Sequence, residues 1–165
     1  MKNYRTSILT AVLLLQIANQ GATADEVPAV HTIRSPIDRV VIVRLKNKTD
    51  MLDGLKQAVA REKIKNAVFM SGFESVTAFH AHVVANTTLP PKDTFTKENG
   101  PFDLLNVSGM VIDGKVHAHI TLSDTKKATG GHLEPGTPVF TFATITLGIL
   151  SDSADLKRVD DYTWR

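Results

Sequence analysis

Three histidines form the sharpest chemical pattern in the sequence. His117 and His119 are separated by one residue within 115–124, a segment in which apolar and polar side chains alternate. In a β-strand both imidazoles would share one face with their Cα atoms about 7 Å apart, within reach of one ion about 2.0–2.1 Å from each nitrogen. His132 follows two glycines, which can adopt positive φ and fold the chain back toward this strand. We predict a divalent metal site, with zinc as the expected ion, at His117, His119 and His132.

Each candidate residue also has a second interpretation. The three histidines would equally suit a polar strand face on which imidazoles are solvated or hydrogen-bonded. A second His-x-His pair, His80 and His82 in another expected strand, is either a further set of ligands or plain surface. Asp124 and Glu134 are candidate bases if a bound ion supports catalysis, and Asp124 is also a candidate contact for a partner or ligand. Alternatively, Asp124 caps a turn and Glu134 is solvated.

One helix and several strands are expected to position these residues. Asp50 has the side chain of an N-cap, and apolar residues recur at helical spacing from Leu52 to about Lys63. Asp113 and Gly114 form a two-residue hairpin turn between β-rich segments. Loops are expected at 86–100 and 125–129, and strands at 39–45, 66–70, 75–85, 102–112, 115–124 and 139–150.

These elements predict an α+β fold, in which a mostly antiparallel sheet of about six strands packs with one main helix. A single helix leaves one face of such a sheet uncovered. Self-association is the simplest way to cover that face.

The first 24 residues have the pattern of a secretory signal peptide. Lys2 and Arg5 precede the apolar run at 8–15, and the sequence Ala-Thr-Ala at 22–24 supplies a cleavage site. The run is too short for a membrane anchor, which needs about 20 apolar residues. We therefore predict an exported protein, periplasmic or secreted, with no membrane span after cleavage. The expected organisation is a signal peptide at 1–24, an extended lead-in at 25–38, a domain at 39–150 and a charged tail at 151–165.

Charge and cysteine content exclude several classes of protein. The 165 residues contain 19 Lys and Arg and 17 Asp and Glu. Cleavage after Ala24 removes Lys2 and Arg5 but no acidic residue, so the mature chain has 17 charges of each sign. A neutral exported chain lacks the basic surface that non-specific nucleic-acid binding requires. The sequence has no cysteine, so disulfides are excluded and metal ligands must be histidine nitrogens or oxygens.

Three successive segments resemble the signatures of the PPC domain, also called the PCC domain. They are GPFDLLNVSG at 100–109, HAHITLSD at 117–124 and GGHLEPGTPV at 130–139. Residues 70–75 stand in the place of that family's small-residue turn, and the likeness extends over 40–150. The resemblance implies an α+β, sandwich-like fold that assembles as a homotrimer and stands alone in bacteria and archaea. It also implies that His117, His119 and His132 hold zinc or a similar ion.

The resemblance brings further alternatives. Plant members carry AT-hooks, and bacterial members are often described as DNA-binding by analogy, but this chain has no Arg-Gly-Arg-Pro hook. Phe102 and Asp103 lie in the motif that resembles the plant partner-binding segment and are candidate partner contacts, although Phe102 also suits a core position. Asp103 stands where the family usually has glutamate, and the pair His80 and His82 is a second departure.

Three functions stay open on the sequence. The first is an exported metal-binding trimer, and the second is a metal-dependent enzyme that acts on an unknown small molecule. The third is a DNA-binding or protein-interaction module.

Overall fold

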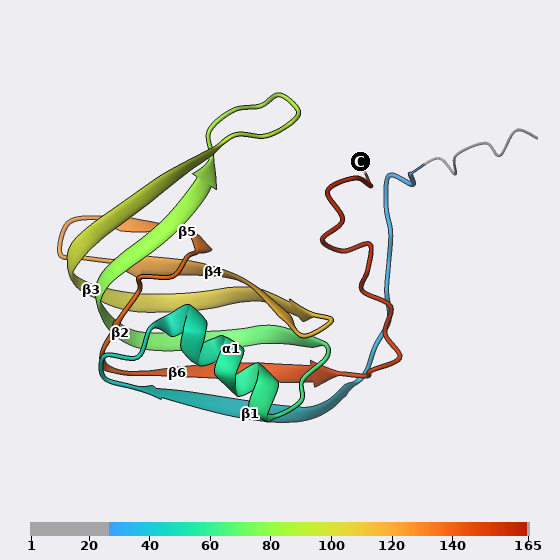
Figure 1. Ribbon diagram of the computed structural model, residues 1–165, viewed down its shortest axis with the longest axis horizontal. Helices are drawn as coiled ribbons and strands as arrows, with labels where there is room; N and C mark the ends of the chain where they lie inside the picture. Colours follow the sequence, from blue (N-terminus) through green and yellow to red (C-terminus); the bar gives the residue numbers. More distant parts are fainter. Residues whose placement is uncertain (1–26, 165) are drawn as a thin grey trace, which may run out of the picture.

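Figure 1 shows the computed structural model of the protein, which describes residues 27–164. The elements in chain order are β1 (Ile37–Lys46), α1 (Met51–Arg61), β2 (Ala67–Val84), β3 (Asp93–Ile112), β4 (Lys115–Ser123), β5 (Ala128–Leu133) and β6 (Val139–Leu150). The strands form one antiparallel sheet in the order β1-β6-β2-β3-β4-β5. The predicted α+β fold with six strands and one helix is confirmed.

The sheet curls until its last strand meets β2 a second time. β5 pairs with β4 along one edge, and its end pairs with β2 through Ala81↔Leu133 and His82↔His132. The pairing is possible because β2 is long. Its first part, up to Val76, lies beside β6, and its second part runs on beyond the end of β6. Strands β2, β3, β4 and β5 therefore close into a ring at one end of the sheet.

The structure differs from the expected elements in three places, and two of these differences compensate in the strand count. The segments 66–70 and 75–85, expected as separate strands, are one strand, β2. Ser71 and Gly72 do not end it, because both stay paired with β6 between two register shifts. A Cβ at Gly72 would overlap the side chain of Val107, so the close approach of this strand to β3 requires glycine here. Conversely, β5 occupies a stretch expected as loop and turn, and β3 begins at Asp93 inside the expected loop 86–100.

Helix α1 begins where the sequence predicts and organises the turn before β6. The Asp50 side chain caps the helix by accepting from the Asp53 backbone N–H at 3.1 Å. Its second oxygen accepts from the backbone N–H groups of Gly136 and Thr137, at 2.7 and 2.9 Å. A single carboxylate thus fixes the helix start and the turn that follows β5.

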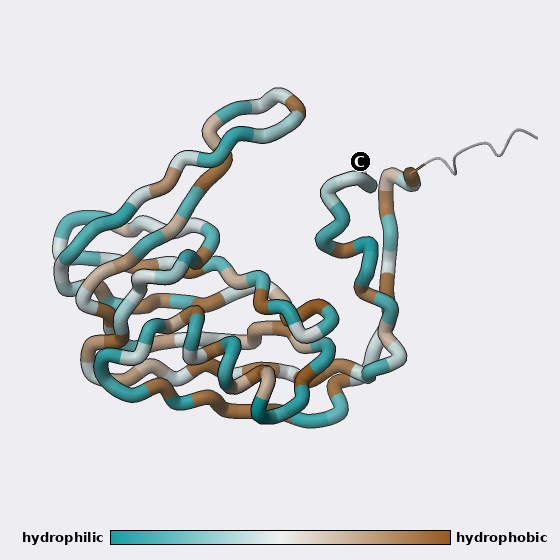
Figure 2. Tube along the Cα trace, in the orientation of Figure 1, coloured by the Kyte–Doolittle hydropathy of each residue, from teal (hydrophilic) through white to brown (hydrophobic). Residues whose placement is uncertain are grey.

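The hydrophobic core lies between α1 and one face of the sheet. Met51, Leu55 and Val59 of the helix are buried against inward-facing residues of the strands, among them Ala118, Ile120 and Leu122 of β4. The opposite, outer face of the sheet keeps apolar side chains exposed. These include Val40, Ile42, Met70, Phe73, Leu105 and Phe140, and Figure 2 shows the hydrophobic stretch along β1.

The two chain ends run side by side beyond the sheet (Figure 1). Residues 27–36 contain neither helix nor strand, and neither do residues 151–164. The two segments meet where Ser35 Oγ accepts from the Ser151 N–H at 3.1 Å and where His31 packs edge-on against Trp164. The predicted signal peptide lies outside the described residues. Within residues 27–164, no helix has the length and apolar character needed to cross a membrane.

Candidate metal centre

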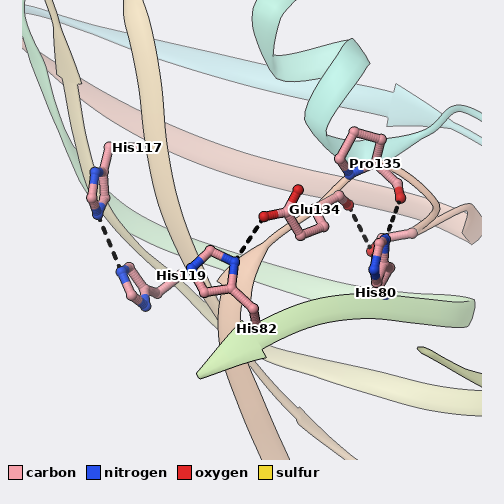
Figure 3. Close-up of polar contacts among 7 residues, drawn as sticks. His80, His82, His117, His119, Glu134 and Pro135 are labelled. Atoms are coloured by element: carbon pink, nitrogen blue, oxygen red, sulfur yellow. Dashed lines mark hydrogen bonds and ion pairs between the residues drawn. The ribbon is translucent and has the colours of Figure 1, made fainter. Parts of the chain in front are cut away.

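His117, His119 and His132 meet on the outer face of β4 and β5. His117 and His119 point away from the core, as the alternation predicts, and His132 of β5 is the direct cross-strand partner of His119. One ring nitrogen from each of the three lies within 4.8 Å of the other two. The Nε2 atoms of His117 and His119 are 3.3 Å apart (Figure 3).

This donor set fits a tetrahedral divalent ion. Nitrogens bound to zinc at about 2.0–2.1 Å stand about 3.3–3.4 Å apart along the edges of a tetrahedron. The Nε2 pair of His117 and His119 already has that separation, so only the His132 ring needs to approach further. Three neutral imidazoles suit zinc, copper or nickel and do not suit magnesium or calcium, which prefer oxygen.

Gly130 and Gly131 allow β5 to lie between β4 and β2. A Cβ at Gly130 would overlap the carbonyl oxygen of Ile120, and one at Gly131 would lie 2.5 Å from the carbonyl oxygen of His82. Their role therefore differs from the expected turn. Both glycines lie inside β5, and the absence of a side chain lets three backbones approach closely enough to bring His132 beside His119.

Asp160 of the C-terminal tail contributes a carboxylate to this cluster. Its Oδ2 lies 2.8 Å from Nδ1 of His117. Because an ionised carboxylate only accepts, Nδ1 carries a proton, and in the neutral ring Nε2 presents its lone pair toward His119. A carboxylate behind a metal-binding histidine orients the ring and raises its basicity. No spacing or motif marks Asp160 in the sequence, which shows only a charged tail.

The second pair, His80 and His82, lies on the neighbouring strand β2. His82 Nδ1 is 2.8 Å from Oε1 of Glu134, and His80 Nδ1 is 2.8 Å from the backbone carbonyl oxygen of Pro135 (Figure 3). The two rings therefore have the same tautomer, with Nδ1 donating. Glu134, for which a solvated role was the alternative, is instead an acceptor for His82 and is held by its own N–H, which donates to the His80 carbonyl.

The electrostatics of the cluster favour the neutral form of His119 and His132. Partial burial lowers the pKa of His119 and of His132 below the ordinary value of 6.5. The neighbouring imidazoles of His117 and His82 lower both pKa values further, because adjacent positive charges repel. Neutral imidazole is the form that binds metal, so the site is prepared for an ion at neutral pH.

The structure separates the remaining candidate residues from this cluster. Asp124 Oδ1 accepts from the backbone N–H groups of Lys126 and Lys127, at 2.6 and 2.8 Å, and these bonds lower the pKa of its carboxyl group. It therefore caps the turn between β4 and β5. Phe102 is buried against Phe79 in an edge-to-face contact, which is the core position considered for it. Asp103 is exposed on β3.

Fold and site together define a class: an α+β domain whose curled antiparallel sheet carries a histidine cluster on its outer face. The Plants and Prokaryotes Conserved (PCC) domain matches residues 33–151. The chain therefore belongs to the PCC domain family, as its sequence motifs predict.

Solved structures share this fold at low sequence identity. A metal-containing protein from Archaeoglobus fulgidus has a TM-score of 0.65 at 19% identity, covering 76% of this chain and 89% of its own. A plant- and prokaryote-conserved (PPC) protein from Pyrococcus horikoshii has a TM-score of 0.60 at 21% identity, with 76% and 87% covered. A candidate DNA-binding protein from Bacteroides thetaiotaomicron has 0.58 at 17% identity, with 74% and 87% covered. None of the curated proteins compared with this chain matches it.

Proposed function

We propose that this protein is an exported, homotrimeric PCC-domain protein that binds one divalent metal ion per subunit through His117, His119 and His132. The observation that carries the proposal is the convergence of one nitrogen from each ring within 4.8 Å. The 3.3 Å separation of two of these nitrogens, at the edge length of a tetrahedral site, supports it. So does the carboxylate of Asp160, which fixes His117 in the metal-binding tautomer.

Zinc is the ion that best suits three neutral imidazoles and no thiolate. Zinc sites accept nitrogen ligands at tetrahedral angles, and the chain offers no cysteine to bind softer ions. The Archaeoglobus fulgidus neighbour is described as metal-containing, which agrees with this choice of function without identifying the ion.

The proposed trimer rests on the exposed apolar face of the sheet and on the family's assembly. Ile42 is 68% exposed and Phe73 is 52% exposed on the face opposite α1. Exposed apolar clusters of this kind mark surfaces that bind other proteins. A copy of the same chain is the economical partner, because closed symmetry leaves no apolar face open.

No contact in residues 27–164 favours the enzyme or the DNA-binding alternative over metal binding. Of the two acids considered as bases, Asp124 caps a turn and Glu134 is bonded to His82. The charges of the mature chain balance, which leaves no net positive charge to attract a phosphate backbone.

The test is elemental analysis of the mature protein, purified without a polyhistidine tag or chelator, beside a His117→Ala/His119→Ala double variant. We expect about one zinc per subunit in the parent, bound by the three-histidine cluster, and none in the variant. Absence of any transition metal from the parent, even after incubation with excess Zn²⁺, would refute metal binding. A periplasmic or secreted location and a trimeric mass, measured on the same preparation, test the other two parts of the proposal.

A further inference from the structure

His82 lies in one row with two of the three clustered histidines. His119 of β4 is the cross-strand partner of His132 on β5, and His132 is in turn the partner of His82 on β2. Residues paired across neighbouring strands project from the same face. The ring centroid of His132 lies 5.1 Å from that of His119 and 4.6 Å from that of His82, on which it stacks.

The contact with Glu134 leaves His82 with a free metal-binding nitrogen. Nδ1 donates to the Glu134 carboxylate at 2.8 Å, so in the neutral ring the lone pair is on Nε2. Figure 3 shows the edge of the His82 ring opposite Glu134 directed toward His119. A carboxylate behind the ring is the same arrangement that Asp160 makes with His117.

His80 differs from His82 because it does not pair with β5 and so does not reach the histidine cluster. It lies on the same strand and face, and the Pro135 carbonyl gives it the same tautomer. Its cross-strand partner, however, is Lys97 of β3, and the pairing between β2 and β5 includes only Ala81 and His82. Both rings pack against Phe95, but among the described residues only the His82 ring also contacts the cluster, through His132.

We propose that Nε2 of His82 becomes the fourth ligand of the metal centre when its ring turns out of the stack on His132, so that four imidazoles from β2, β4 and β5 surround the ion. The inference rests on the metal binding proposed above. It assigns the site to a tetrahedral divalent transition ion, Zn²⁺ above all, and leaves no position for a substrate atom. A closed set of four protein ligands is typical of zinc sites that hold the metal rather than use it in catalysis. The protein would then bind and retain metal, and would not be a metal-dependent hydrolase.

The matched variants His82→Gln and His80→Gln test the proposal. In His82→Gln the introduced amide can still donate to Glu134, so the variant removes the imidazole ligand while it keeps a donor for that hydrogen bond. Removing a carboxylate behind a ligand costs about 10- to 100-fold in metal affinity, and losing a ligand costs at least as much. We therefore expect Zn²⁺ affinity, measured by chelator competition, to fall about 100-fold or more in His82→Gln and to stay within about threefold in His80→Gln.

The visible spectrum of bound Co²⁺ reports the coordination geometry and whether a ligand position is open. In Co²⁺-loaded parent protein we expect a tetrahedral visible spectrum that added azide does not change, whereas azide should bind at the open position of His82→Gln. X-ray absorption of the zinc-loaded parent should give four imidazoles, and this measurement needs no variant to fold. Three imidazoles plus a light atom, or an azide-sensitive parent, would overturn the fourth ligand and leave metal binding intact. A parent that binds no metal would overturn both.

Discussion

Replacement of Asp160 by Asn tests whether the C-terminal tail is part of the metal centre. The carboxylate accepts from His117 Nδ1 at 2.8 Å, and Asp160→Asn keeps the size of the side chain while removing its charge. Loss of a partner behind a metal-binding histidine costs about 10- to 100-fold in affinity, or about 1.4–2.7 kcal/mol. The Asp160 side chain is 54% exposed and that of His117 is 35% exposed, so solvent screens the pair. We therefore expect the lower end of the range, a loss of about tenfold.

The assay is competition for Zn²⁺ against a chromogenic chelator at constant pH and ionic strength. Asp152→Asn is the control, because it removes the same charge from the same tail without touching a histidine. His117→Ala sets the value for complete loss of this ligand. Equal affinities for Asp160→Asn and the parent would refute the positioning role. Equal losses in Asp160→Asn and Asp152→Asn would show that the tail acts through its net charge alone.

Three further predictions concern pH, packing and assembly. Because the pKa values of His119 and His132 are lowered in the folded state, the metal-free protein binds fewer protons than the unfolded chain below pH 6.5, and its free energy of unfolding should fall as pH decreases through that range. Urea unfolding should show this dependence, and a His119→Gln/His132→Gln variant should lack most of it. Gly130→Ala should destabilise the fold by about 1–3 kcal/mol, seen as a lower urea midpoint, because its Cβ meets backbone rather than a movable side chain. Ile42→Glu should convert the proposed trimer to monomer in sedimentation analysis with little change in secondary structure, and an unchanged mass would contradict the proposed interface.

The sequence predicted that His117 and His119 share one face of a strand. It did not predict how His132 and Asp160 come to lie beside them. The alternation in 115–124 correctly placed His117 and His119 on one side of β4, since side-chain direction in a strand follows from position alone. The arrival of His132 depends on close contact between backbones at Gly130, which the sequence showed only as flexibility. Asp160 was missed because a tail without periodic pattern carries no signal for a contact 43 residues away.

Most strands of the fold were predictable from the same alternation of apolar and polar residues. The prediction failed where a local turn signal conflicted with long-range strand pairing. Ser71 and Gly72 have turn composition, yet they lie within β2 because both pair with β6, and β3 pairs with β2 before and after them. Tertiary pairing overrides local propensity most easily in a central strand, where both edges supply hydrogen bonds.

His80 and His82 show why topology, rather than spacing, decides which residues form a site. The sequence presents them as equivalents: two imidazoles, one residue apart, on one face of one strand. The structure gives both the same tautomer through an oxygen acceptor on the 134–135 segment. Both rings contact Phe95, and they differ because β5 returns to β2 at His82 and no further, so that only the His82 imidazole also stacks on His132. The curl of the sheet, which no local pattern encodes, therefore places one member of the pair beside the histidine cluster and keeps the other outside it.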